Sequence, residues 1–210
     1  MVIKMTQRLI CLAIGYCFGC ISIALIVSKV FNSDLRSQGS GNLGTTNALR
    51  VLGLKAGLIT FFGDIAKGVF PFLICRAIFP EFGEFGIMAG VYGTVGAVLG
   101  HIFPFYLKFK GGKGIATCIG SMFCVGLSFA PWIVPIFVVT TFGLAGISKY
   151  ISLGSILFMI MIPIFLTIVQ FYVEGTVLMS GIAAIILYKH KENIQRLLTG
   201  TERKFYGNAK

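Results

Sequence analysis

The sequence predicts an all-α, polytopic membrane protein with about seven transmembrane helices. Of its 210 residues, 56% are hydrophobic and only 12% are charged, and the mean hydropathy is +0.90. Soluble domains carry about 25% charged residues, and a chain of this length cannot bury so much apolar sequence in its own core. We therefore expect a single integral-membrane domain over residues 1–210.

The first three apolar stretches are each long enough for one span, which needs roughly 20 residues. They run from Leu9 to Val27, from about Leu54 to Phe79, and from Phe85 to Leu107. Residues 115–147 are too long for one span and short for two. Because proline breaks a helix, Pro131 at their middle predicts two short helices that meet at a tight turn.

Two further spans complete the predicted set. The sixth runs from about Leu153 to Tyr172, and the seventh from Val177 to Lys189. The seventh is short for a span, so we expect it to tilt little or to end in the membrane interface.

The basic residues predict which face each loop occupies. Of the 18 Lys and Arg residues, 14 fall on the odd-numbered connections and the C-terminal tail, whereas Lys4, Arg8 and Arg76 fall on the opposite side. Cytoplasmic loops collect Lys and Arg, so we expect the N-terminus outside and the odd loops and C-terminus in the cytoplasm. The net charge of +11 is thereby explained without nucleic acid. Lys4 and Arg8 also resemble the start of a signal peptide, but the apolar run after them is long for one, so we expect this span to be retained.

The first polar loop, Gln38–Arg50, is rich in glycine, hydroxyl and amide groups. Its glycines at 39, 41 and 44 match G-x-G-x-x-G, but a dinucleotide site needs a preceding strand, and apolar helices flank this loop. Glycines let backbone N–H groups approach an anion, and Arg50 offers a planar guanidinium suited to phosphate. We expect phosphate recognition here, with an ordinary solvated turn as the alternative.

The second polar region reads Gly100-His-Ile-Phe-Pro104 and then Lys108-Phe-Lys-Gly-Gly-Lys-Gly114. Three lysines interleaved with three glycines, directly ahead of a helix, predict an anion-binding loop backed by a helix N-terminus. A basic anchor at the membrane surface would need the lysines but not the glycines. His101 belongs either to this site or to the hydrogen bonding at the helix end.

The third polar region is the tail Lys189–Glu202. If it is helical, His190, Asn193 and Arg196 lie on one face, three residues apart. A basic amphipathic tail that rests on anionic lipid is the competing interpretation. The connection Lys149–Ser155 adds hydroxyl groups on the same predicted face.

Two features lie within the predicted spans. Asp64 and Lys67 are one helical turn apart, and charges in a span are costly, so we expect them mainly to neutralise each other. The spacings Gly15-x-x-x-Gly19, Gly86-x-x-x-Gly90 and Gly96-x-x-x-Gly100 are typical of closely packed membrane helices.

The inventory of polar groups narrows the chemistry. Two histidines and seven acidic residues show no metal-ligand cluster and no Ser–His–Asp arrangement, and no cofactor is indicated. Many anion donors with few bases suit a substrate that is already activated and releases phosphate. Catalysis would then rest on positioning and electrostatic stabilisation.

The three polar regions resemble the cytoplasmic motifs of the bacterial acyl-phosphate:glycerol-3-phosphate acyltransferases. The similar segments are Gly-Ser-Gly-Asn-x-Gly-x-Thr-Asn-x-x-Arg at 39–50, Gly-His-x-Phe-Pro with Phe-Lys-Gly-Gly-Lys-Gly at 100–114, and Lys-His-x-x-Asn-Ile-x-Arg-Leu-x-x-Gly-Thr-Glu at 189–202. They occur in order over nearly the whole chain. Asp64, Lys67 and Gly68, and Tyr150 with Ser152, also look like family features.

The resemblance implies transfer of a fatty acyl group from acyl phosphate to the 1-hydroxyl of glycerol 3-phosphate. The products would be lysophosphatidic acid and phosphate, in the first step of phospholipid synthesis at the cell membrane. It also implies a functional partner upstream, the enzyme that makes acyl phosphate. Which group accepts the hydroxyl proton is open, and our hypothesis is a phosphate oxygen of a substrate.

The resemblance also implies roles for individual residues, and Glu202 is expected to hold the tail in place. The expected catalytic residues are Ser40, Arg50, Lys110, His190 and Asn193. The expected substrate-binding residues are Gly41, Asn42, Thr46, Asn47, His101, Gly111, Gly112, Lys113, Gly114, Ser152 and Arg196.

Two other classes of protein compete with this interpretation. A transporter of anions or lipid phosphates should carry polar residues through its spans and on both faces, whereas the predicted outer face is nearly bare. A metal-dependent lipid-phosphate transferase should carry acidic pairs at the cytoplasmic surface, which the sequence lacks.

Overall fold

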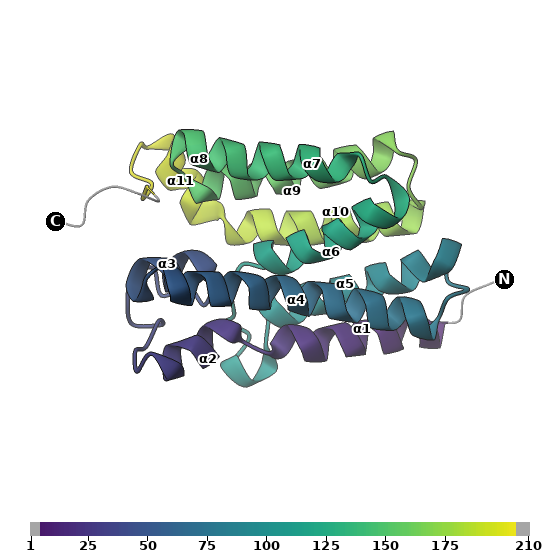
Figure 1. Cartoon of the computed structure of the whole chain (residues 1–210), viewed down its shortest axis with the longest axis horizontal. Coiled ribbons are helices and arrows are strands. Elements are labelled where there is room, and N and C mark those ends of the chain that lie inside the picture. The colour runs from purple at the N-terminus through teal and green to yellow at the C-terminus, as the bar shows by residue number, and fades with distance from the viewer. Residues whose placement is uncertain (1–4, 205–210) are drawn as a thin grey trace. The chain divides into compact units, whose positions relative to one another are not determined.

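The computed structural model describes residues 5–204, without the side chain of Phe85, and every regular element in that range is a helix (Figure 1). The all-α prediction is therefore confirmed; Lys4 lies outside the described range. The helices group into two compact units, one ending at Ser128 and the other beginning at Phe129. The expected single domain over 1–210 stays a prediction, and each unit is described by itself below.

The first unit contains six α-helices and two short 3-10 helices. They are α1 (Met5–Cys20), α2 (Ile23–Val30), α3 (Thr45–Leu52), α4 (Leu54–Ile78), η1 (Glu84–Gly86), α5 (Ile87–Ile102), η2 (Phe105–Leu107) and α6 (Ile115–Phe129), whose last residue already belongs to the second unit.

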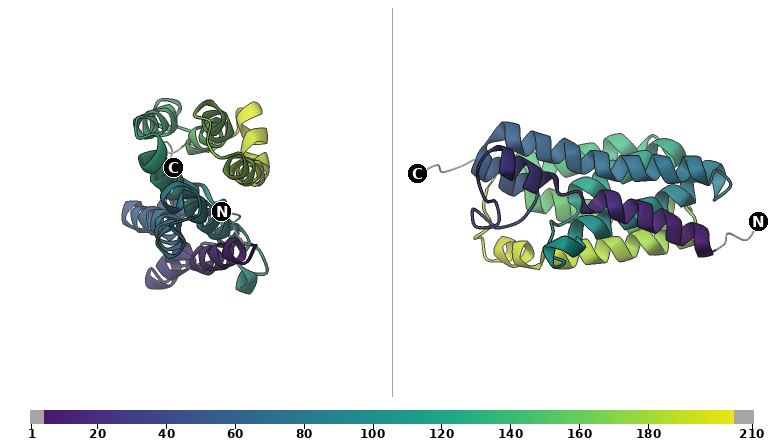
Figure 2. Two further views of the ribbon diagram at one scale, coloured as in Figure 1. Left: turned by 90° about the vertical axis from the view of Figure 1, so that its right-hand side faces the viewer. Right: turned by 90° about the horizontal axis from the view of Figure 1, so that it is seen from below.

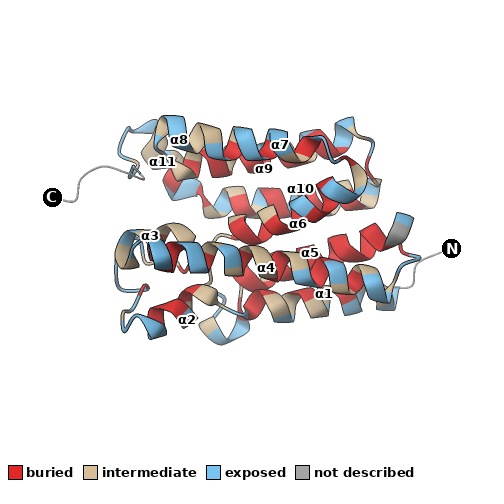
Figure 3. Ribbon diagram, in the orientation of Figure 1, coloured by how far each residue is buried: buried red, intermediate tan, exposed pale blue. Residues whose placement is uncertain are grey.

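The core of the first unit is built around α5. Every residue of α5 except Leu99 is buried, as Figure 3 shows by its nearly unbroken red ribbon. Helices α1 and α4 both pack against it and run side by side in Figures 1 and 2. At the α1–α5 crossing, a Cβ atom on Gly15 or Gly19 would overlap the α5 backbone at Gly93 or Ala97. The predicted close packing through Gly15 and Gly19 is thus confirmed.

The first predicted span differs from the structure in one respect. Residues 5–30 are long and apolar enough to cross a membrane, but the helix is interrupted between Cys20 and Ile23. Ser22 caps the second piece, because its Oγ accepts the N–H of Leu25 at 3.4 Å. The interruption leaves backbone carbonyls without helical partners, and side chains from distant parts of the chain donate hydrogen bonds to them, as described below. No local sequence pattern predicts the interruption.

The second unit begins at the turn that Pro131 was expected to form. Helix α6 ends at Phe129 and α7 starts at Ile133, so the predicted break is confirmed. The helices of this unit are α7 (Ile133–Val138), the π-helix η3 (Val139–Gly143), α8 (Leu144–Ser148), α9 (Ile151–Ile168), α10 (Val173–Lys189) and α11 (Lys191–Leu198).

The boundaries of the last two predicted spans need correction. Helix α9 ends at Ile168, four residues before the predicted Tyr172, and α10 begins at Val173 instead of Val177. Glu174 lies in the first turn of α10, where the helix dipole favours a negative charge. A polar residue that ended the apolar run in the sequence is therefore part of the helix.

Length and composition identify four helical stretches that can cross a membrane. They are Met5–Val30, Leu54–Ile78, Ile87–Leu107 and Ile151–Ile168. The apolar stretches Ile115–Phe129 and Ile133–Ser148 are shorter, and α10 has 17 residues. These segments are compatible with seven spans, and the number of spans and their orientation stay predictions.

Candidate active site

Asn47 organises the first polar loop from a buried position on α3. Its Oδ1 accepts the N–H of Ser40 at 2.8 Å, and its Nδ2 donates to the carbonyls of Leu35 at 3.0 Å and Gln38 at 3.1 Å. Gly39 adopts a φ of +62°, and a Cβ there would overlap Asn47 Oδ1. We expected Asn47 to bind substrate; in the structure its amide group holds the loop in shape.

The loop also rests on an apolar cluster. Leu35 and Leu43 are buried together with Ala24 of α2 and Ala48 of α3, and Leu107 of η2 packs against them. Above this base, Ser40 and Arg50 are exposed, and Asn42 and Thr46 are half-buried. A buried apolar cluster thus supports the loop that carries the hydroxyl, amide and guanidinium groups predicted to bind substrate.

The second polar region folds back on the end of α5. Lys108 and Phe109 both adopt positive φ values, +53° and +61°, which are uncommon for residues with side chains. The chain reverses there, so that Gly111 N–H donates to Ile102 O at 3.0 Å and Gly112 N–H donates to His101 O at 3.1 Å.

This geometry changes the expected role of two glycines. The N–H groups of Gly111 and Gly112 are occupied by carbonyls of α5, so they serve the loop's own structure. Helix α6 begins immediately afterwards at Ile115, and the first N–H groups of a helix have no partner within it. The predicted anion binding would then fall to the α6 N-terminus and to Lys110 and Lys113, which are exposed and half-buried respectively.

His101 lies beneath this loop. Its side chain is 6% exposed, and its Nδ1 is 3.7 Å from Asp64 Oδ1. A Cβ on Gly112 would overlap His101 Nε2, so the imidazole lies directly against the glycine backbone. His101 therefore supports the loop, and its expected part in substrate binding stays a prediction.

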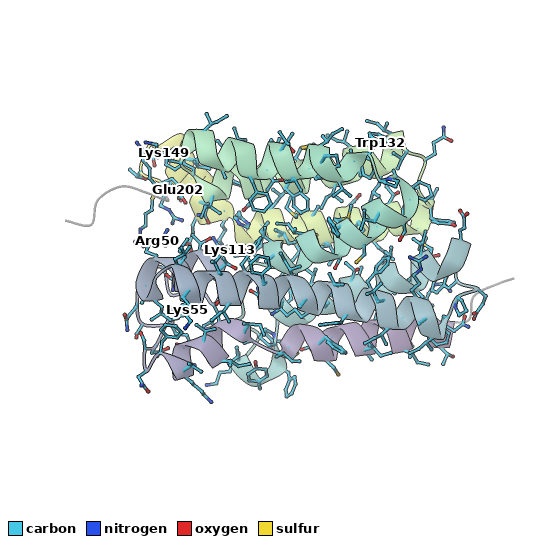
Figure 4. The ribbon with its side chains drawn as sticks, viewed as in Figure 1. Arg50, Lys55, Lys113, Trp132, Lys149 and Glu202 are labelled. Atoms are coloured by element: carbon cyan, nitrogen blue, oxygen red, sulfur yellow. The ribbon has the colours of Figure 1, made fainter. Side chains whose placement is uncertain are left out.

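The first and second polar regions meet within the first unit. The same hypothetical Cβ on Gly112 would overlap the carbonyl oxygen of Leu43, so the two loops are in contact. Figure 4 shows Arg50, Lys55 and Lys113 in the same half of this unit. The structure thus brings into contact the two loops that carry the predicted anion donors, about 60 residues apart in sequence.

The third polar region forms the end of the second unit. His190 is buried at the corner between α10 and α11, with its Nδ1 2.8 Å from Ile186 O. Since a carbonyl oxygen can only accept, Nδ1 carries the proton in the neutral ring, and Nε2 is the nitrogen that can accept one. This is the arrangement that a general base or an acceptor of a substrate hydroxyl requires.

The carboxylate of Glu202 accepts hydrogen bonds from three of the predicted site residues. It accepts hydrogen bonds from Ser152 Oγ at 3.0 Å, Asn193 Nδ2 at 2.8 Å and Arg196 Nε at 2.7 Å. The N–H groups of Thr201 and Glu202 both donate to Arg196 O, which folds the tail back on α11. In Figure 4, Glu202 lies at the same end of this unit as Lys149, opposite Trp132.

These contacts also set the acidity of Glu202. Burial raises the pKa of its carboxyl group, but the hydrogen bonds from Arg196, Asn193 and Ser152 outweigh burial, so the pKa lies below its ordinary value of 4.5. Glu202 was expected only to hold the tail. Nothing in the local sequence around Glu202 predicted that it would also accept a hydrogen bond from Ser152, 50 residues earlier.

Comparisons with known proteins identify the family. Residues 9–200 match the family model for glycerol-3-phosphate acyltransferase. A protein of that name from Clostridioides difficile is 40% identical, covering 91% of this chain and 92% of its own length. Another from Aquifex aeolicus is 38% identical over 91% of this chain and 95% of its own length.

Two solved structures have the same fold. Both are crystal structures of PlsY (YgiH), an integral membrane glycerol 3-phosphate acyltransferase. The glycerol 3-phosphate form matches with a TM-score of 0.84 and 36% identity, covering 95% of this chain and 96% of that one. The lysophosphatidic acid form matches with a TM-score of 0.82 and 34% identity, covering 95% of each chain. The chain described here therefore belongs to the glycerol-3-phosphate acyltransferase family and is an integral-membrane acyltransferase.

Proposed function

We propose that this enzyme transfers a fatty acyl group from acyl phosphate to the 1-hydroxyl of glycerol 3-phosphate. The hydroxyl oxygen forms an ester bond to the acyl carbon, the bond between that carbon and the bridging oxygen breaks, and inorganic phosphate leaves with the electron pair. The products are lysophosphatidic acid and phosphate, which makes the reaction the first acylation in phospholipid synthesis.

The observation that carries this proposal is the contact between Leu43 and Gly112, which joins the first two polar regions. Each substrate has one phosphate, and both regions offer donors suited to an anion. We assign the acyl phosphate to Lys110, Lys113 and the N-terminus of α6, with Gly111, Gly112 and Gly114 shaping the loop around it. A phosphate at a helix N-terminus beside lysines is stabilised by the helix dipole and by charge.

Glycerol 3-phosphate is assigned to the first polar loop. The guanidinium of Arg50 suits its phosphate, and Ser40, Asn42 and Thr46 supply hydroxyl and amide groups for its hydroxyls. His190 and Asn193 are assigned to the reacting hydroxyl and carbonyl. The solved PlsY form that holds glycerol 3-phosphate supports an acceptor of this kind.

No cofactor enters the proposed reaction, since acyl phosphate is already activated. A phosphate oxygen of a substrate accepts the hydroxyl proton as the ester bond forms. By the distribution of Lys and Arg, the reaction takes place on the cytoplasmic face of the cell membrane. Acyl phosphate then comes from a separate upstream enzyme, with its acyl chain in the lipid and its phosphate at the surface.

A choice between donors tests the proposal. The purified protein is incubated with labelled glycerol 3-phosphate and either acyl phosphate or the matching acyl-CoA, and labelled lysophosphatidic acid and free phosphate are measured. We expect product with acyl phosphate, one phosphate per acyl group transferred, and none with acyl-CoA. Turnover that requires the thioester would overturn the proposal.

Paired variants separate the assigned residues from their neighbours. Arg50→Ala is compared with Lys55→Ala, and Lys110→Ala with Lys108→Ala. The two variants of a pair each remove one positive charge from the same region. We expect the Arg50 and Lys110 variants to lose activity and the other two to retain it. Equal losses within a pair would show that only general positive charge matters.

A further inference from the structure

The middle of α4 holds an ion pair that does more than neutralise itself. Lys67 Nζ lies 2.8 Å from Asp64 Oδ1, and the two side chains are only 4% and 2% exposed. Neutralisation alone would need no third partner. Lys67 Nζ nevertheless also donates to the carbonyl of Ile21 at 3.1 Å, in the interruption between α1 and α2.

That interruption is tied to the end of α5 by two tyrosines. Tyr106 of η2 donates its hydroxyl to Cys20 O at 2.6 Å, and Tyr16 of α1 donates its hydroxyl to Phe103 O at 2.8 Å. These bonds run in opposite directions between the same two parts of the chain. Together with Lys67, they satisfy backbone carbonyls that have no helical partner, as buried backbone groups require.

The other end of the ion pair faces the second polar region. His101 Nδ1 lies 3.7 Å from the same Asp64 oxygen, and the far side of the imidazole lies against Gly112. Gly112 immediately precedes Lys113 and the N-terminus of α6. Buried polar groups thus lie in contact from the α1–α2 interruption through α4 to the loop assigned to acyl phosphate, although the 3.7 Å step between Asp64 and His101 is too long for a hydrogen bond.

We propose that Lys67 is a positioning residue. It fixes the α1–α2 interruption and, through Asp64 and His101, the position of the Gly112–Gly114 segment relative to α5. The inference rests on the proposed function, because that segment is assigned there to the acyl phosphate. Loss of the Lys67–Ile21 bond lets the segment shift and weakens binding of this substrate, while the glycerol 3-phosphate loop keeps its own support from Asn47.

The test must remove the bond without leaving a buried charge, because a lone buried charge is strongly destabilising. The double variant Asp64→Asn, Lys67→Met removes both charges and keeps both side-chain shapes. Lys67→Arg, a second variant, keeps the ion pair but changes the reach to Ile21. Thr60→Val is the matched control, because Thr60 is buried in the same helix and its hydroxyl donates to Ala56 O within that helix.

Thermal midpoints, kcat and the KM for each substrate are measured for all four proteins. We expect the double variant to raise the KM for acyl phosphate about tenfold, since displacements near 1 Å have large kinetic effects. Lys67→Arg should raise it by about threefold by the same mechanism. The KM for glycerol 3-phosphate should change little in either variant, and Thr60→Val should match the wild type.

An unchanged KM for acyl phosphate in the variants that fold, or an equal rise in both KM values, overturns the inference. If the double variant does not fold, Lys67→Arg alone decides by the same criterion. Failure of the proposed function looks different: the wild type and Thr60→Val would then show no turnover with acyl phosphate.

Discussion

Asn193 donates a hydrogen bond from Nδ2 to Glu202 Oε1 at 2.8 Å, and this bond closes the tail of the chain onto α11. Arg196 binds the other carboxylate oxygen at 2.7 Å. Because the carboxylate accepts one hydrogen bond from an amide and one from a guanidinium, it holds the side chains of Asn193 and Arg196 in one orientation. The polar face of α11 is therefore fixed before any substrate arrives.

Replacement of Glu202 by glutamine should destabilise the protein. The amide cannot accept on both atoms, so the bond from Arg196 or that from Asn193 is lost, and hydrogen bonds to charged groups contribute about 2 kcal/mol. Thermal unfolding in detergent measures the effect. Glu192→Gln is the control, because Glu192 is exposed and 3.8 Å from Arg196, and exposed pairs contribute below about 1 kcal/mol. Equal effects of the two changes would contradict this account of Glu202.

The lowered pKa of Glu202 predicts a dependence of stability on pH. A carboxyl group whose pKa is lower in the folded state stabilises that state at neutral pH, and the contribution is lost as the pH falls below 4.5 and through the folded pKa. The thermal midpoint of the wild type should therefore fall more steeply on acidification than that of Glu202→Gln. Parallel pH profiles would show that Glu202 does not titrate with folding.

Gly112→Ala should impair the second polar region. The added methyl group would overlap His101 Nε2 and Leu43 O, so both supporting segments must move, and activity should fall by about tenfold or more. Gly181→Ala in α10 is the control, since nothing lies within 4 Å of a Cβ there. Alanine in a helix is favoured over glycine by about 0.5–1 kcal/mol, so the control should be as stable as the wild type or more so. An active Gly112→Ala enzyme would show that the close contact is not needed.

His190→Ala tests which group accepts the proton. If a substrate phosphate oxygen is the acceptor, the variant loses rate through poorer positioning, and the pH dependence of kcat keeps its shape. The measurement is kcat against pH for both proteins at saturating substrate. Loss of one limb of the profile with unchanged substrate binding would identify His190 as the base.

Much of the fold follows from the apolar runs and their interruptions. Leu54 begins α4 as predicted, and Pro131 separates α6 from α7, because hydrophobic length and proline act locally. The interruption at Ile21 could not be predicted in the same way. It depends on Lys67 and Tyr106, which come from distant parts of the sequence.

The candidate site shows the same division between local and distant causes. The motif pattern predicted site residues around Gly112 and Asn193, but it did not indicate which polar groups are occupied by hydrogen bonds within the protein. Gly112 N–H is taken by His101 O because the chain reverses at Lys108 and Phe109. Asn47 is likewise occupied by three backbone groups, a role that only the folded loop reveals.

The bond that breaks in the donor is the most direct test of acyl transfer from acyl phosphate. Acyl phosphate carrying ¹⁸O at the oxygen that bridges carbon and phosphorus is incubated with the enzyme and unlabelled glycerol 3-phosphate, and both products are analysed by mass spectrometry. The account predicts one ¹⁸O in the released phosphate and none in lysophosphatidic acid, because the carbon–oxygen bond breaks and the new ester oxygen comes from glycerol. Release of the label in free fatty acid, with unlabelled phosphate, would mean that the phosphorus–oxygen bond breaks instead, and would contradict it.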